Sequence, residues 1–152
     1  MSQFYCRENE LRKLNKRYEG DKFECIVIYG RRRVGKTALI NEFCKEKPTI
    51  FFSALNTTGK ENLEALSKSI MTFERPDMES APEFRSYDAA LDELTALSKE
   101  KRMVFVIDEY PYVARSSKSF SSVLQLLIDQ YKDRSKLMLI LCGSSMSYME
   151  DH

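Results

Sequence analysis

The sequence predicts an α/β protein in which helices cover both faces of a mostly parallel sheet of about four strands. Four short apolar runs, rich in β-branched and aromatic residues, are separated by helical patterns, and a glycine-containing loop follows the first run directly. Nearly continuous apolar runs are expected for strands buried on both faces of a parallel sheet. The predicted strands cover residues 24–30, 49–54, 103–108 and 136–143.

Apolar residues at helical spacing fill the intervals between these strands. An amphipathic helix around residues 8–20, closed by Gly20, precedes the first strand. The further helical patterns cover residues 35–46, 61–73, 86–100 and 119–133. Strands and helices that alternate in this way predict right-handed crossovers and a parallel sheet.

Length, charge and cysteine content exclude several classes of protein. The 152 residues are enough for one domain with a hydrophobic core. Lys+Arg (24) and Asp+Glu (23) nearly cancel, so no overall positive field favours nucleic acid or an anionic membrane. The four cysteines form no CxxC pair and no apolar signal segment precedes them, which predicts a cytoplasmic protein. The longest apolar runs are strand-sized, well below the roughly 20 residues of a membrane-spanning helix.

The segment Gly30-Arg-Arg-Arg-Val-Gly35-Lys36-Thr37 matches GxxxxGK[ST] and lies between a predicted strand and a predicted helix. In such a loop the main-chain amides and the helix N-terminus face a phosphate. Lys36 would contact the β- and γ-phosphates, and the Thr37 hydroxyl would bind Mg²⁺. A glycine-rich turn with an incidental lysine is the alternative. The predicted nucleotide contacts in this segment are Gly30, Arg31, Arg32, Arg33, Val34, Gly35, Lys36, Thr37 and Ala38.

The three consecutive arginines occupy the variable positions of this loop, where peptide amides rather than side chains face the phosphates. They raise the local positive potential around a triphosphate by a modest amount that salt screens. One or two of them would be solvated or would contact a neighbouring surface. A nucleic-acid role for the triplet is not favoured.

The segment VFVIDEY provides a second candidate motif. Asp108 ends an apolar strand, a position from which its carboxylate reaches a Mg²⁺ ion at the carboxyl edge of a parallel sheet. Glu109 follows and would polarise the attacking water. The alternative is a strand that ends in an acidic turn before Pro111.

A third, weaker element is LILCGSS, where Ser144 follows the fourth predicted strand. Its hydroxyl would contact the γ-phosphate or the attacking water, although serines after strands commonly cap turns. The predicted catalytic residues are therefore Lys36, Glu109 and Ser144, and the predicted metal ligands are Thr37 and Asp108.

These motifs together resemble the archaeal-type ATPase family, a group of P-loop ATPases related to AAA and STAND proteins. FYCRENEL (4–11) resembles the family's N-terminal signature, and VIDEYPYVARSSKSFSSVLQ resembles its extended Walker B region. The resemblance implies an incomplete, ASCE-type, three-layer P-loop NTPase core that takes ATP and Mg²⁺. It also implies that the N-terminal segment packs beside the nucleotide base, with Arg7 as a contact. Alternatively, Arg7 pairs at the surface with Glu8 or Glu10. Cys6 stands where the family usually has glycine.

Members of that family continue beyond the segment that corresponds to residues 1–152, so we expect these residues to be the N-terminal part of a longer ATPase domain. By the same resemblance, the strand before the P-loop neighbours the fourth strand, followed by the third and the second. A fifth strand would then be missing, and the P-loop strand would lie at an open edge. A homo-oligomer formed at that edge is a hypothesis, and contact with nucleic acid is expected only through the absent regions.

The leading functional hypothesis is Mg²⁺-dependent ATP hydrolysis that couples nucleotide state to the absent C-terminal regions. The first alternative is a nucleotide-binding or interaction scaffold with little hydrolysis. A small-molecule kinase is a second, although the Asp-Glu pair fits water activation better. A GTP switch would need an NKxD-type segment after a strand, whereas Asn15-Lys16 precedes the first strand and lacks the aspartate.

Overall fold

The computed structural model describes residues 2–29, 36–77, 83–99 and 101–143. Its centre is a sheet of four parallel strands in the order β1-β4-β3-β2. This order confirms the predicted one, including the place of β1 at an edge. The strands are β1 (Glu24–Tyr29), β2 (Thr49–Ser53), β3 (Met103–Asp108) and β4 (Leu137–Gly143).

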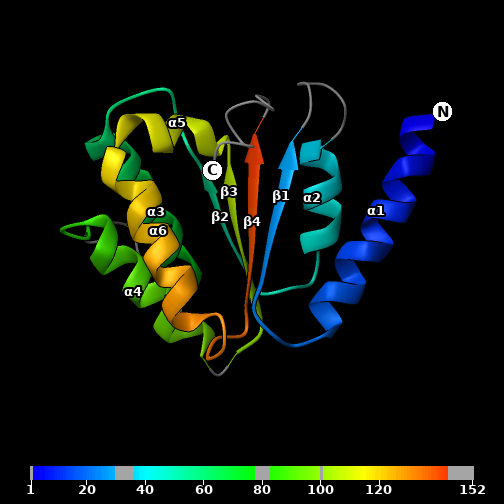
Figure 1. Cartoon of the computed structure of the whole chain (residues 1–152). Coiled ribbons are helices and arrows are strands. Elements are labelled where there is room, and N and C mark those ends of the chain that lie inside the picture. Colours follow the sequence, from blue (N-terminus) through cyan, green and yellow to red (C-terminus); the bar gives the residue numbers. More distant parts are fainter. Residues whose placement is uncertain (1, 30–35, 78–82, 100, 144–152) are drawn as a thin grey trace.

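Helices cover both faces of this sheet, so the predicted three-layer α/β architecture is confirmed (Figure 1). One face carries α1 (Ser2–Glu19) and α2 (Lys36–Cys44). The opposite face carries α3 (Gly59–Glu74), α4 (Tyr87–Ser98), α5 (Tyr110–Ser116) and α6 (Lys118–Tyr131). None of the helices in the described residues is both long and apolar enough to cross a membrane.

The central strands β3 and β4 are buried on both faces because successive side chains point to opposite sides of the sheet. Val104 and Val106 pack with α2, whereas Phe105 and Ile107 pack with the four helices of the other layer. This double burial explains the continuous apolar runs of the sequence. Phe51, which the pattern predicts as core, is only half-buried and lies at the margin of the α2-side cluster.

Side-chain caps fix the start of two helices that cover the sheet. The Thr58 hydroxyl accepts a hydrogen bond from the Glu61 amide before α3, and the Ser86 hydroxyl accepts one from the Ala89 amide before α4. Each cap satisfies an amide that the helix itself leaves without a partner.

Helix α5 was not predicted from the sequence. The sequence pattern places no helix between β3 and residue 119, but the structure has a helix of 7 residues that begins at Tyr110. Proline is compatible with the first turn of a helix, so Pro111 starts this helix rather than breaking it. Tyr110 and Val113 are buried, and this tertiary packing stabilises a helix too short to form alone. Helix α1 also begins six residues earlier than predicted, at Ser2 rather than residue 8.

Arg102 connects three segments at the amino-terminal edge of the sheet, just before β3. Its guanidinium donates to the carbonyl oxygens of Tyr18 (Nε, 3.0 Å), Arg17 (Nη2, 3.0 Å) and Lys136 (Nη1, 2.8 Å), and also to that of Lys22. Its central carbon lies 5.1 Å from the centre of the Tyr18 ring. One side chain therefore fastens the end of α1 to the segments that lead into β1 and β4.

We expect Arg102→Ala to lower the free energy of unfolding by about 3 kcal/mol, because hydrogen bonds from a charged donor are individually strong and several carbonyls lose their partner. Arg102→Lys should recover only part of this loss, since an ammonium cannot reproduce the planar set of donors. Urea unfolding measures both variants, with Arg134→Ala, an exposed arginine, as the control. A change no larger in Arg102→Ala than in the control would contradict this role.

Candidate functional site

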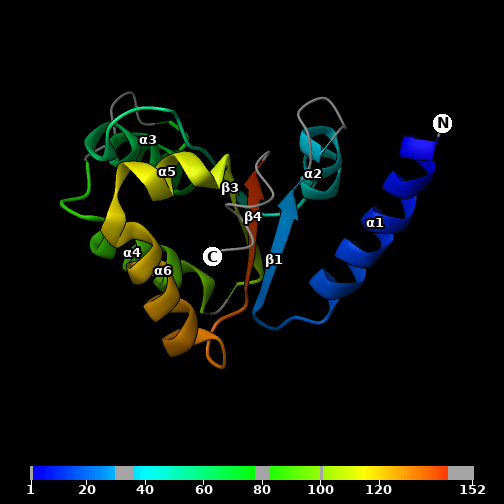
Figure 2. The same cartoon turned by 45° about the horizontal axis from the view of Figure 1, so that its top comes forward.

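The ends of the strands bring the predicted motifs to one edge of the sheet. In the register, Tyr29 at the end of β1 is the partner of Gly143 in β4, and Asp108 at the end of β3 is the partner of Ser53 in β2. Strand β4 lies between β1 and β3. Figure 2 shows the start of α2 at the same edge as the carboxyl ends of β1, β3 and β4. The strands that precede the two main motifs, β1 and β3, thus lie on either side of a single strand.

The predicted phosphate loop lies largely outside the described residues. Gly30–Gly35 and Ser144 are not part of the chain that the structure describes, so their predicted contacts stay predictions. Lys36 begins α2, and Thr37 and Ala38 follow in its first turn with exposed side chains. An exposed first turn at the carboxyl edge presents amide groups and the positive end of a helix dipole, the features that bind phosphate.

Asp108 is held at the end of β3. Its carboxylate Oδ1 accepts a hydrogen bond from the Glu109 amide (3.1 Å), and its carbonyl oxygen accepts one from the Ala54 amide (2.9 Å). The residue is half-buried, unlike the fully buried Val106 and Ile107 before it. A carboxylate and a threonine hydroxyl are hard oxygen donors, the kind of ligand that Mg²⁺ prefers, so Asp108 and Thr37 fit this ion chemically.

Glu109 has a left-handed backbone conformation, with φ 54° and ψ 48°. This conformation costs a residue with a Cβ about 1–2 kcal/mol. Glu109 occupies the position before the first turn of α5, but its side chain does not cap the helix. Its carbonyl oxygen accepts the Tyr112 amide (3.0 Å), which fixes the sharp change from strand to helix. Such strained positions cluster at functional sites, and no glycine or asparagine in the sequence signalled this one.

The predicted nucleotide contact Arg7 lies in α1, and its side chain is outside the part of the chain that the structure describes. The amino-terminal end of α1 points toward the same edge of the sheet as the start of α2 (Figure 1). A contact between Arg7 and a nucleotide therefore stays a prediction.

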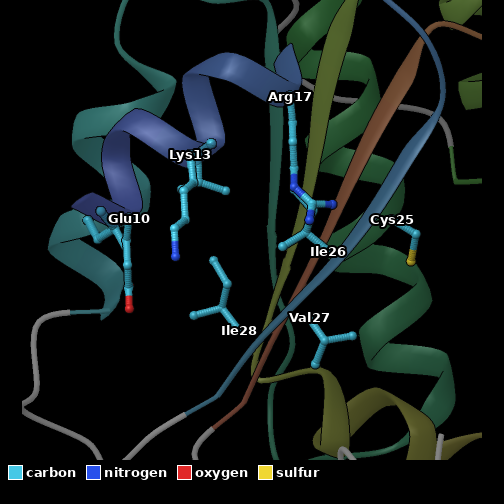
Figure 3. Close-up of a pocket in the computed structure, with 9 residues that line it drawn as sticks. Glu10, Lys13, Arg17, Cys25, Ile26, Val27 and Ile28 are labelled. Atoms are coloured by element: carbon cyan, nitrogen blue, oxygen red, sulfur yellow. The ribbon is translucent and has the colours of Figure 1, made fainter. Parts of the chain in front are cut away.

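The open edge of β1 borders a hollow of about 480 Å³ between that strand and α1. Glu10, Lys13 and Arg17 of α1 line it together with Cys25 and Val27 of β1 (Figure 3). Val27 is 42% exposed, and β1 pairs with β4 alone among the described strands, which makes β1 an edge strand. Ile28 of β1 and Leu39 of α2 also line the hollow.

Comparison with protein families finds a match over almost the whole chain. The model of the ATPase domain predominantly from Archaea matches residues 4–152. A sequence relative, an uncharacterized protein of Methanocaldococcus jannaschii, is 31% identical over 146 residues, which are 96% of this chain and 30% of that protein.

Solved structures share the fold. The Walker-type ATPase PABY2304 of Pyrococcus abyssi is similar with a TM-score of 0.69 and 25% identity, over 95% of this chain and 47% of that one. The ORC2 protein of Aeropyrum pernix, solved in ADPNP and ADP complexes, is similar with a TM-score of 0.64 and 20% identity, over 95% of this chain and 43% of that one. This chain therefore spans less than half the length of these proteins.

Proposed function

Since the chain belongs to the family of ATPase domains found predominantly in Archaea, we propose that it binds ATP with Mg²⁺ and hydrolyses it to ADP and phosphate. The observation that carries this proposal is the acidic pair Asp108-Glu109 at the end of β3, separated from the start of α2 by the single strand β4. The ATPase family and the P-loop fold account for nucleotide binding. The acidic pair accounts for hydrolysis.

In this proposal the loop before α2 holds the triphosphate. Amides of Gly30–Gly35 and the first turn of α2 face the phosphate oxygens, and the Lys36 ammonium pairs with the β- and γ-phosphates. The side chains of Arg31, Arg32 and Arg33 add positive potential without replacing the amides. Arg7 would contact the nucleotide from α1.

Thr37 and Asp108 would hold Mg²⁺ through the hydroxyl and the carboxylate. When bound, the ion supplies positive charge to the β- and γ-phosphate oxygens. The hydrogen bond from the Glu109 amide to Oδ1 orients the Asp108 carboxylate before any ligand arrives. Such orientation lowers the cost of forming the site.

Glu109 would act as the general base. Its carboxylate accepts a proton from a water molecule as the water oxygen forms a bond to the γ-phosphorus and the bond to the ADP oxygen breaks. Ser144 would contact the γ-phosphate or this water. The left-handed backbone turns the chain sharply at Glu109, and the Glu109 side chain does not cap α5.

We propose that the process driven by ATP hydrolysis takes place in regions beyond residues 1–152. Relatives extend well beyond the segment described, in keeping with residues 1–152 as the N-terminal part of a longer ATPase domain. Nucleic acid would be contacted through those regions, and a homo-oligomer would form at the open edge of β1. The described cysteines Cys25 and Cys44 are free thiols, in keeping with a cytoplasmic location.

A phosphate-release assay run beside an ATP-binding titration tests hydrolysis. The proposal predicts Mg²⁺-dependent phosphate release that saturates over the same ATP concentrations as binding. ATP binding without phosphate release would favour the nucleotide-binding scaffold instead. Competition by GTP as strong as that by ATP would show that the site does not select adenine.

A further inference from the structure

Asn62 is a fully buried polar residue in the first turn of α3, outside the predicted site. Its Oδ1 accepts a hydrogen bond from the Leu55 amide (2.9 Å). Its Nδ2 donates to the Leu55 carbonyl (3.1 Å) and to the Ser116 hydroxyl (3.1 Å). A buried amide is costly unless it is hydrogen-bonded, and this one joins the loop after β2 to the end of α5.

Both segments that Asn62 joins lead directly to the acidic pair. The loop after β2 is bonded to the main chain of β3, since the Ala54 amide donates to the Asp108 carbonyl. Helix α5 begins immediately after Glu109 and ends at Ser116. These contacts form a closed ring. The ring runs from Asp108 to the loop after β2, through the Asn62 side chain to Ser116, and back along α5 to Glu109.

Further contacts keep this ring rigid. A Cβ on Gly59 would lie 2.9 Å from the Ser116 carbonyl oxygen, so the start of α3 and the end of α5 touch through their backbones. The Tyr87 hydroxyl donates to the Gly59 carbonyl (2.5 Å), and burial raises the pKa of Tyr87 to about 12, which keeps that donor protonated. The first turn of α3 is thus a fixed support for α5.

We propose that Asn62 is a positioning residue that fixes the orientation of the Asp108-Glu109 pair through Leu55 and Ser116. Its structural part stands on the hydrogen bonds alone, and its kinetic part rests on the proposed ATPase function. Glu109 is held in a strained left-handed conformation. A strained residue relaxes when its surroundings no longer enforce it, so loss of the Asn62 amide should loosen the turn.

Asn62→Ala tests the proposal, with Ser67→Ala as the matched control. Ser67 is also a buried polar residue of α3, but its hydroxyl donates to the Leu63 carbonyl (2.8 Å) and accepts from the Phe84 amide (3.0 Å). Both variants remove a buried polar group from the same helix. They differ in whether the hydrogen bonds of that group connect to the segments that hold Asp108 and Glu109.

Hydrogen exchange of the Ala54 and Tyr112 amides is the first readout, because these amides bond to the carbonyls of Asp108 and Glu109. Asn62→Ala should speed their exchange at least about tenfold beyond any change in global stability, whereas Ser67→Ala should not. Equal exchange in the two variants would overturn the proposal. This readout decides the structural part even if the wild-type chain releases no phosphate, a result that would count against the proposed function alone.

The second readout separates turnover from binding. Asn62→Ala should lower kcat about tenfold and leave ATP affinity within about twofold, while Ser67→Ala should leave both unchanged. Ser116→Ala should show a smaller loss of the same kind, and adding it to Asn62→Ala should cause little further loss because the two residues share one bond. An unchanged kcat in Asn62→Ala, or equal losses in affinity and kcat, would overturn the kinetic part.

Discussion

Lys36→Ala is expected to reduce ATP affinity by at least about 100-fold, because it removes a charge-assisted contact to two phosphates at the point where negative charge is densest. The expected loss exceeds that from any one loop arginine, since amides rather than arginine side chains face the phosphates. Titration of ATP in the presence of Mg²⁺ measures it.

Lys45→Ala is the control for this loss. Lys45 lies one residue beyond the end of α2 and pairs with Glu42 (3.1 Å) on the surface, so its removal changes the net charge equally. If the two variants weakened ATP binding to the same small extent, Lys36 would have no specific role and the GxxxxGK segment would be an ordinary turn.

Glu109→Gln is expected to lower kcat by about 100-fold or more, since general-base catalysis contributes a factor of this size, while ATP affinity stays within about twofold. Glutamine has nearly the shape of glutamate but cannot accept the proton from water. Phosphate release and ATP titration on the same sample measure the two effects. Turnover that persists in Glu109→Gln would remove Glu109 from the role of base.

Glu109→Gly separates the catalytic role from backbone strain. Glycine adopts the left-handed conformation freely, so this variant should gain about 0.5–1 kcal/mol in free energy of unfolding while losing hydrolysis. Glu109→Gln keeps the strain and should show no such gain. A loss of stability in Glu109→Gly would mean that the glutamate side chain itself stabilises the turn.

Much of the fold could be predicted because the relevant signals are local and repeated. Val104, Val106, Leu139 and Ile140 lie in runs that only a doubly covered parallel strand would bury, and the structure places all of them in the core. The open edge at β1 followed from the family sheet order. Helix α5 was not predicted because a proline directly after an acidic pair is typical of a turn. Only tertiary packing makes this segment helical.

The site could be predicted only for residues whose type and position in the sequence are enough to indicate their role. Asp108 lies at the end of β3 as expected, but the left-handed conformation of Glu109 depends on the junction of β3 with α5. Asn62 did leave a signal: it falls on the buried stripe of α3 with Leu66 and Ile70, where a polar residue needs partners. Those partners, Leu55 and Ser116, come from segments whose proximity only the fold reveals.

Isothermal titration of the chain with ATP, in the presence and in the absence of Mg²⁺, tests the central claim most directly. The account predicts saturable binding of one ATP per chain that strengthens when Mg²⁺ is added, since Thr37 and Asp108 would then contribute through the ion. No heat of binding under either condition, from a chain shown to be folded, would contradict the claim that these residues form a nucleotide site.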